Sequence, residues 1–78
     1  MQNKRELTFG EKSVGVNFNP SELPSVTESK QLFAAAIDQM NDLRETTTSP
    51  EQKRLCSVAI TQIQNAQMWT VKAYTWRD

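Results

Sequence analysis

The sequence contains no histidine and only one cysteine, Cys56, among its 78 residues. Without histidine, the chain lacks the side chain that most often serves as a general base near neutral pH. A single cysteine cannot form an internal disulfide, and no Cys/His cluster is available to bind zinc. Glycine-rich phosphate-binding loops of the G-x-G-x-x-G or Walker type are also missing. These absences predict no catalytic residues, no metal and no cofactor, so we expect a protein that is not an enzyme.

Neither sign of charge dominates, because nine basic residues balance nine acidic ones. A protein that coats long DNA or RNA needs a net basic surface, so we expect no long nucleic acid as a partner. A small anionic ligand needs only a few cations and stays possible. No segment approaches the roughly 18 apolar residues of a membrane span, and residues 1–9 lack the apolar core of a signal peptide. We therefore expect a cytoplasmic protein with no membrane contact, which a lone cysteine also favours.

Glycine and proline are scarce and unevenly placed: both glycines and two of the three prolines fall within residues 9–24. Apolar residues alternate there with Gly and Asn, at Val14, Val16 and Phe18. A period of two predicts an extended segment with one buried face. Residues 19–22 (NPSE) predict a turn, and the polar residues 1–8 are expected to be mobile. We interpret residues 1–24 as an extended N-terminal arm that lies across the helices.

Residues 25–45 contain no glycine or proline and show helical periodicity. Ser25-x-x-Glu28 has the pattern of a capping box, which predicts where this first helix begins. One face about 140° wide is apolar. Its members are Val26, Leu32, Phe33, Ala36, Ile37, Met40 and Leu43.

A second, longer helix is predicted over residues 49–76. Ser49 is placed to cap it, Pro50 suits the first helical position, and Gln52 can complete a capping box. The threonines 46–48 are poor helix formers and make a short link. Two helices joined by so short a link form an antiparallel hairpin, so the sequence predicts an all-α fold.

The second helix is apolar over about 220° of its circumference, more than one packing contact needs. The apolar positions are Leu55, Cys56, Val58, Ala59, Ile60, Ile63, Ala66, Trp69, Val71, Ala73, Tyr74 and Trp76. A chain this short, without disulfide or metal, commonly gains stability by oligomerisation. We therefore predict a single helical-hairpin domain over residues 1–78 that assembles as a homo-oligomer.

An antiparallel hairpin brings the start of the first helix close to the end of the second. Aromatic and basic side chains gather at that end, namely Phe18, Trp69, Tyr74 and Trp76 with Lys30 and Lys72. Rings can stack on nucleobases, and lysines with a helix N-terminus can hold phosphates. The same rings can instead be core or interface residues, and Lys72 can be solvated. Both interpretations stay open from the residues alone.

Two segments resemble a known family: FGEKSVGVNFNPS in the arm and LCSVAITQIQNAQMWTVKAYTWRD at the end of the chain. The pattern around Met68-Trp69 and Lys72-Ala73 is its most specific part. Over about residues 7–78, the chain is similar to small phage proteins of the anti-CBASS and anti-Thoeris helical-hairpin family, which are cyclic-nucleotide sponges.

The resemblance implies a homo-oligomer, commonly a hexamer, in the host cell cytoplasm. It implies pockets between protomers that hold a cyclic di- or trinucleotide, or a cyclic ADP-ribose isomer, without cleaving it. Phe18 and Lys30 are the nearest matches to the aromatic and basic residues of the family's pocket. Lys72, Trp76 and Arg77 from the second helix are further candidates for ligand binding.

Two other functions stay open at this point. The chain can be a structural or protein-interaction module with no nucleotide ligand, its aromatic end contacting a protein. It can also be a small binder of single-stranded nucleic acid, which would show a steep salt dependence.

Overall fold

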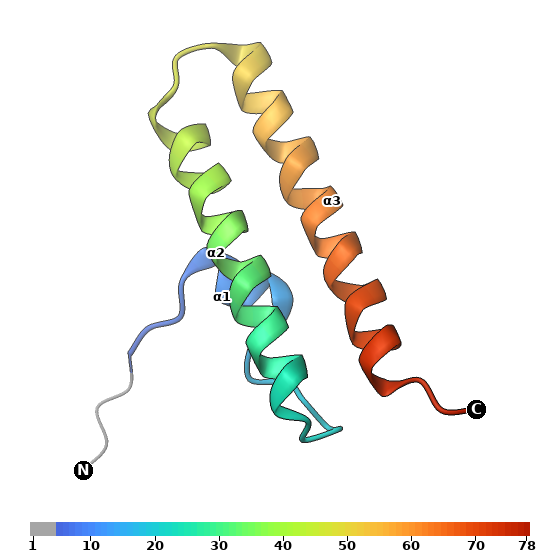
Figure 1. Cartoon of the computed structure of the whole chain (residues 1–78). Coiled ribbons are helices and arrows are strands. Elements are labelled where there is room, and N and C mark those ends of the chain that lie inside the picture. Colours follow the sequence, from blue (N-terminus) through green and yellow to red (C-terminus); the bar gives the residue numbers. More distant parts are fainter. Residues whose placement is uncertain (1–4) are drawn as a thin grey trace.

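The fold of residues 5–78, taken from a computed structural model, consists of three helices and contains no strand in that range. They are α1 (Phe9–Val14), α2 (Pro24–Thr46) and α3 (Pro50–Thr75). Figure 1 shows α2 and α3 running antiparallel side by side, with α1 against the first half of α2. The predicted helical hairpin is confirmed. None of the helices between residues 5 and 78 combines the length and apolar character needed to cross a membrane.

The prediction of an extended arm over residues 1–24 is wrong for Phe9–Val14, which is helical. Residues 1–4, included in the predicted mobile segment, lie outside the described range. The helix begins at a capping box: Glu11 N–H donates to Thr8 Oγ1 (3.0 Å) and Thr8 N–H donates to Glu11 Oε1 (2.8 Å). It ends at Gly15, whose φ of 63° is the left-handed conformation that favours glycine. The capping box at Thr8 and the glycine at position 15 therefore determine a helix here, although the alternation of Val14 and Val16 indicated an extended segment.

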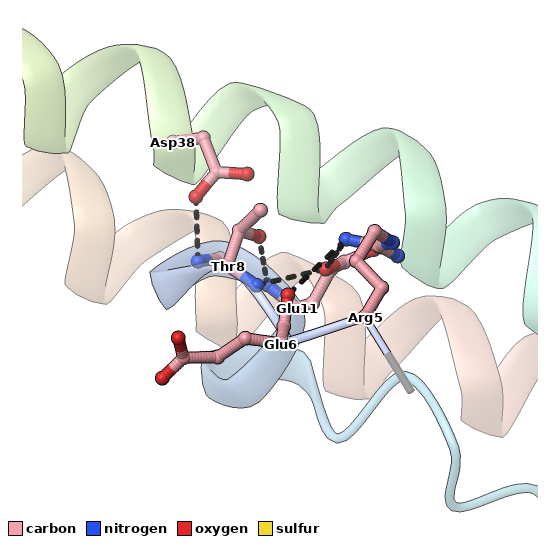
Figure 2. Close-up of polar contacts among 6 residues, drawn as sticks. Arg5, Glu6, Thr8, Glu11 and Asp38 are labelled. Atoms are coloured by element: carbon pink, nitrogen blue, oxygen red, sulfur yellow. Dashed lines mark hydrogen bonds and ion pairs between the residues drawn. The ribbon is translucent and has the colours of Figure 1, made fainter. Parts of the chain in front are cut away.

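Two further contacts hold the start of α1 (Figure 2). Arg5 forms a two-pronged ion pair with Glu11, at 2.8 and 2.6 Å. Hydrogen bonds from Arg5 and the Thr8 backbone lower the pKa of Glu11 to about 2. The Gly10 N–H donates to Asp38 Oδ1 of α2 at 2.7 Å. A Cβ at Gly10 would lie 2.1 Å from the Ala34 carbonyl oxygen, so α1 approaches α2 this closely only with glycine at that position.

The link between α1 and α2 contains the predicted turn, since the Glu22 N–H donates to the Asn19 carbonyl at 3.1 Å. The predicted capping box at Ser25 and Glu28 is wrong. Leu23 is the N-cap residue and has no side-chain cap, and Pro24 occupies the first turn of α2. The missing N–H of proline needs no partner there, which lets α2 begin without a capping side chain.

The start of α3 follows the prediction in one respect and departs from it in another. Ser49 Oγ accepts from the Gln52 N–H at 3.1 Å, as predicted. The Gln52 side chain does not return to Ser49, because its Oε1 accepts from the Thr47 hydroxyl. The Ser49 N–H donates to the same hydroxyl at 3.2 Å. Thr47 therefore takes part in capping as well as linking the helices.

The core lies where all three helices meet. Its buried residues are Val14, Val16, Ala34, Ile37 and Ile60. The apolar face predicted for α2 is displaced around the helix: Lys30 is 4% exposed while Leu32 is 74% exposed. The reason is that α1 packs on the side of α2 that carries Lys30 and Ala34, a neighbour that periodicity does not reveal.

Only one side of α3 is covered. Cys56, Ile60 and Gln67 are buried, whereas other members of its apolar arc stay exposed. The large exposed ones are Leu55, Val58, Trp69, Tyr74 and Trp76. The molecule is thin, 46 × 41 × 12 Å, and its radius of gyration of 14.3 Å exceeds the value of about 11.5 Å for a compact domain of this length. A single chain therefore leaves much of its apolar surface unpaired.

Candidate ligand-binding groove

The largest groove described lies between the α1–α2 link, the start of α2 and the C-terminal half of α3. Its volume is about 550 Å³. The lining residues are Val14, Phe18, Asn19, Pro20, Ser21, Val26, Lys30, Gln67, Met68, Val71 and Thr75. This is the end of the hairpin at which the sequence predicted an aromatic and basic cluster. The lining is mostly apolar with a few polar groups, the usual make-up of a small-molecule site.

Lys30 is the charged residue among those that line the groove, and its side chain is buried. The residue is 4% exposed, and its ammonium donates to the Gly15 carbonyl at 3.0 Å and to the Phe18 carbonyl. Burial lowers its pKa from the usual lysine value, because the charged form loses hydration. An ammonium has three donors, so one N–H remains beyond these two carbonyls. Lys30 thus fixes the link between α1 and α2 and places a positive charge beneath it.

Phe18 lies directly over this charge, with its ring centroid 5.4 Å from Lys30 Nζ. The residue is 70% exposed, which is unusual for a phenylalanine. An exposed ring anchored above a cation offers a stacking surface for a planar ligand. The structure therefore brings together two of the predicted site residues.

Trp76 and Arg77 line a second groove of about 480 Å³ with Leu23 and Tyr74. This groove shares Ser21 and Thr75 with the first, so the two are neighbours. The Trp76 indole donates to Asp78 Oδ1 at 3.0 Å.

Lys72 is separate from both grooves. Its Nζ lies 5.3 Å from the centroid of the Trp69 ring, on the exposed side of α3. The five predicted residues are thus a pair in the main groove, a pair in the neighbouring groove, and one lysine outside both.

Two residues of the main groove were missed in the sequence analysis. Gln67 is 7% exposed and lies one helical turn from Ile63 and from Val71, on the face that periodicity assigns to the core. A polar residue at an apolar position was the signal that could have identified it. Met68 is not among the positions of the apolar face predicted for α3, and the structure places it in the lining of the groove.

The arrangement offers a ring for stacking, a buried cation and an apolar floor, which together suit a planar ligand that carries negative charge. Within residues 5–78, no three His, Cys, Asp or Glu side chains gather closely enough to hold a metal ion. A protein-family model described as "Acb2/Tad1, hairpin domain" matches residues 11–75.

The chain belongs to the Acb2/Tad1 hairpin family. This is the anti-CBASS and anti-Thoeris sponge family, and membership confirms the resemblance found in the sequence. In general terms, membership of this family implies a sponge that binds cyclic nucleotides. Members of the family are binding proteins and not enzymes. No curated protein and no solved structure gives a significant match to the chain.

Proposed function

We propose that this protein binds and sequesters cyclic nucleotide immune messengers without cleaving them, and so counters CBASS or Thoeris defence in the cytoplasm of a phage-infected host. The observation that carries the proposal is the main groove, in which Phe18 lies over the buried Lys30. Membership of the Acb2/Tad1 family supports it independently.

The groove suits the chemistry that these messengers share. A cyclic di- or trinucleotide, or a cyclic ADP-ribose isomer, combines a planar base with phosphate. The base stacks on Phe18, and the remaining N–H of Lys30 attracts a phosphate as a charge-assisted donor. Trp76 and Arg77 in the neighbouring groove extend the site, and Lys72 supplies charge from a second protomer.

The functional unit is a homo-oligomer, with a hexamer as the form that the family suggests. The support is the uncovered apolar side of α3, which carries Leu55, Val58, Trp69 and Trp76. A patch of exposed large side chains on one helix marks a protein–protein contact. Sites formed or completed between protomers would then depend on assembly.

Binding is tested by a thermal-shift screen of cyclic nucleotides followed by calorimetry. A ligand at 100 times its dissociation constant stabilises the native state by about 2.7 kcal/mol. Phe18→Ala should weaken binding by about 1–3 kcal/mol, the value of one stacked base. Phe9→Ala is the matched control, since Phe9 packs against Arg44 and is not among the residues that line the groove. A full screen without any stabilising cyclic nucleotide would leave a protein-interaction module as the better account.

Sequestration is tested separately from binding. The ligand is incubated for hours with excess protein and magnesium, the protein is denatured by heat, and the supernatant is analysed by reversed-phase chromatography. We expect full recovery of the cyclic compound. A linear product that grows with time and disappears with chelator would identify a phosphodiesterase instead.

A further inference from the structure

We infer that Gln67 determines base specificity in the main groove, its amide pairing with the edge of an adenine rather than a guanine. The inference rests on the proposed function, because it names the base that the same groove recognises. It follows from the position of Gln67, a polar residue that is mostly buried but lines the groove.

Gln67 comes from the middle of α3 and is 7% exposed. Within residues 5–78, the side-chain hydrogen bonds of this part of α3 come from its neighbours, such as the Gln64 amide that donates to the Ser13 carbonyl at 3.3 Å, and the Gln67 amide takes part in none. Yet no fully buried side-chain nitrogen or oxygen in that range lacks a partner. Because the Gln67 amide has no partner, its nitrogen and oxygen are not fully buried and face open space beside the residue. That space is the main groove and the adjoining groove beside Ser13, both of which Gln67 lines. A ligand in the groove meets an amide with its hydrogen-bonding capacity free.

The other polar side chains of the groove are already engaged. The Asn19 amide donates to the Leu23 carbonyl (2.9 Å) and to Thr27 Oγ1 (3.0 Å), and its oxygen accepts from Ser21 Oγ at 2.5 Å. The Thr75 hydroxyl donates to the Val71 carbonyl at 2.8 Å. These groups hold the walls of the groove, so recognition of a base edge falls to Gln67.

An amide presents one donor group and one acceptor group side by side. Adenine offers the complement on its N7/N6 edge, an acceptor beside a donor, and glutamine pairs with both atoms. Guanine offers two acceptors, N7 and O6, on the corresponding edge, which suits arginine or lysine. Lys30 is the lysine of this groove, and two of its three donors already bind backbone carbonyls. The groove therefore favours adenine.

The experiment compares cyclic di-AMP with cyclic di-GMP by calorimetry on three proteins. These are the natural sequence, Gln67→Met, and the control Gln31→Met, an exposed glutamine of α2 that is not among the lining residues. Methionine keeps the length of the side chain and removes the amide. We expect the natural protein to prefer cyclic di-AMP, Gln67→Met to bind it about tenfold more weakly, and affinity for cyclic di-GMP to change less than about twofold. Gln31→Met should leave both affinities unchanged.

A second measurement does not depend on a variant. In ¹⁵N-labelled natural protein, the side-chain NH₂ resonances of Gln67 should shift when cyclic di-AMP is added, and those of Gln31 should not. Equal weakening of both ligands by Gln67→Met, a natural preference for cyclic di-GMP, or an unmoved Gln67 resonance at saturation would overturn the inference and leave the sponge function standing. Binding of neither compound would also overturn it, whereas the sponge function is decided by the wider screen.

Discussion

Both α1 and α3 pack against α2, but by different means. The contact of α3 with α2 is mainly apolar, through residues such as Ile37 and Ile60, with Arg44 Nη1 donating to Ser57 Oγ at 3.1 Å. The contact of α1 with α2 depends on a glycine that permits close approach and on Asp38, which accepts the Gly10 N–H. We expect the first contact to tolerate exchange of one apolar residue for another of similar size. The second also buries Val14, but it depends in addition on the exact position of one glycine and one carboxylate.

This difference explains where the groove forms. The apolar contact lets two long helices run side by side along the hairpin. The specific contact holds a short helix on one flank of α2, so that the link after it, held by Lys30, crosses to the end of α3. Disruption of each contact should therefore have distinct consequences, taken here from the largest expected effect on the stability of the chain to the smallest.

Ile60→Ala should lower the free energy of unfolding by about 2–5 kcal/mol, because it leaves a cavity at the junction of the helices. Urea denaturation followed by circular dichroism measures the change. Thr61→Ala, at an exposed polar position of the same helix outside its apolar face, is the control and should change stability far less. Equal effects would mean that the wrong side of α3 has been assigned to the hairpin contact.

Gly10→Ala should cost about 3 kcal/mol, because the new methyl group would overlap the Ala34 carbonyl and force α1 away from α2. Gly15→Ala is the comparison: its methyl group meets only Phe18 Cβ at 3.7 Å, so it adds only the strain of a φ of 63°, about 1–2 kcal/mol. Hydrogen exchange should show loss of protection in residues 12–14 for Gly10→Ala while the hairpin remains. Similar exchange in both variants would contradict the close docking of α1.

Lys30→Met should destabilise the protein by about 1 kcal/mol. Two backbone carbonyls lose their donor, and relief from burying a charge offsets part of that loss. Thermal unfolding measures it, with the exposed Lys12→Met as control. A more stable variant would show that burying the Lys30 charge destabilises the protein by more than its two hydrogen bonds stabilise it.

Glu11 makes the capping of α1 dependent on pH. Its pKa is about 2 in the folded protein against 4.5 ordinarily, so the unfolded chain takes up a proton first as the pH falls. The stabilisation from Glu11 is therefore complete above about pH 4.5 and is lost between about pH 4.5 and pH 2. Glu11→Gln should flatten the fall of the melting temperature in that interval. Glu28→Gln, exposed on α2, should leave the natural slope; a Glu11→Gln curve as steep as the natural one would rule the mechanism out.

Ala66→Trp should barely affect the fold of a single chain, because Ala66 is exposed there. It should instead disrupt the proposed assembly, since Ala66 lies among the exposed apolar residues of α3. Light scattering after size exclusion should give a smaller mass than for the natural protein at micromolar concentration. Asn65→Trp, at an exposed polar position outside the apolar face of α3, should keep that mass. A natural protein with the mass of one chain would remove the basis for oligomerisation.

The sequence by itself determined the hairpin. Helical periodicity, the short threonine-rich link, and the cap formed by Ser49 are local or repeated signals, and each leads to α2 and α3 within one residue of the bounds observed. It also indicated the end of the hairpin at which Phe18 and Lys30 meet, since an antiparallel arrangement fixes which ends are neighbours. The capping box of α1, formed by Thr8 and Glu11, is also a local signal in the sequence. The alternation of Val14 and Val16 favoured an extended segment instead.

Only the tertiary structure decided which side of each helix is buried. The apolar arc of α3 is wider than one contact, so periodicity could not separate the side that meets α2 from the side that carries Trp69. Lys30 and Gln67 are polar residues at buried positions, and burial depends on neighbours far away in the sequence. The docking of Gly10 against Ala34 is likewise a contact between distant segments. These are the contacts that form the groove, because a binding site depends on side chains that the fold brings together and not on the order of residues along the chain.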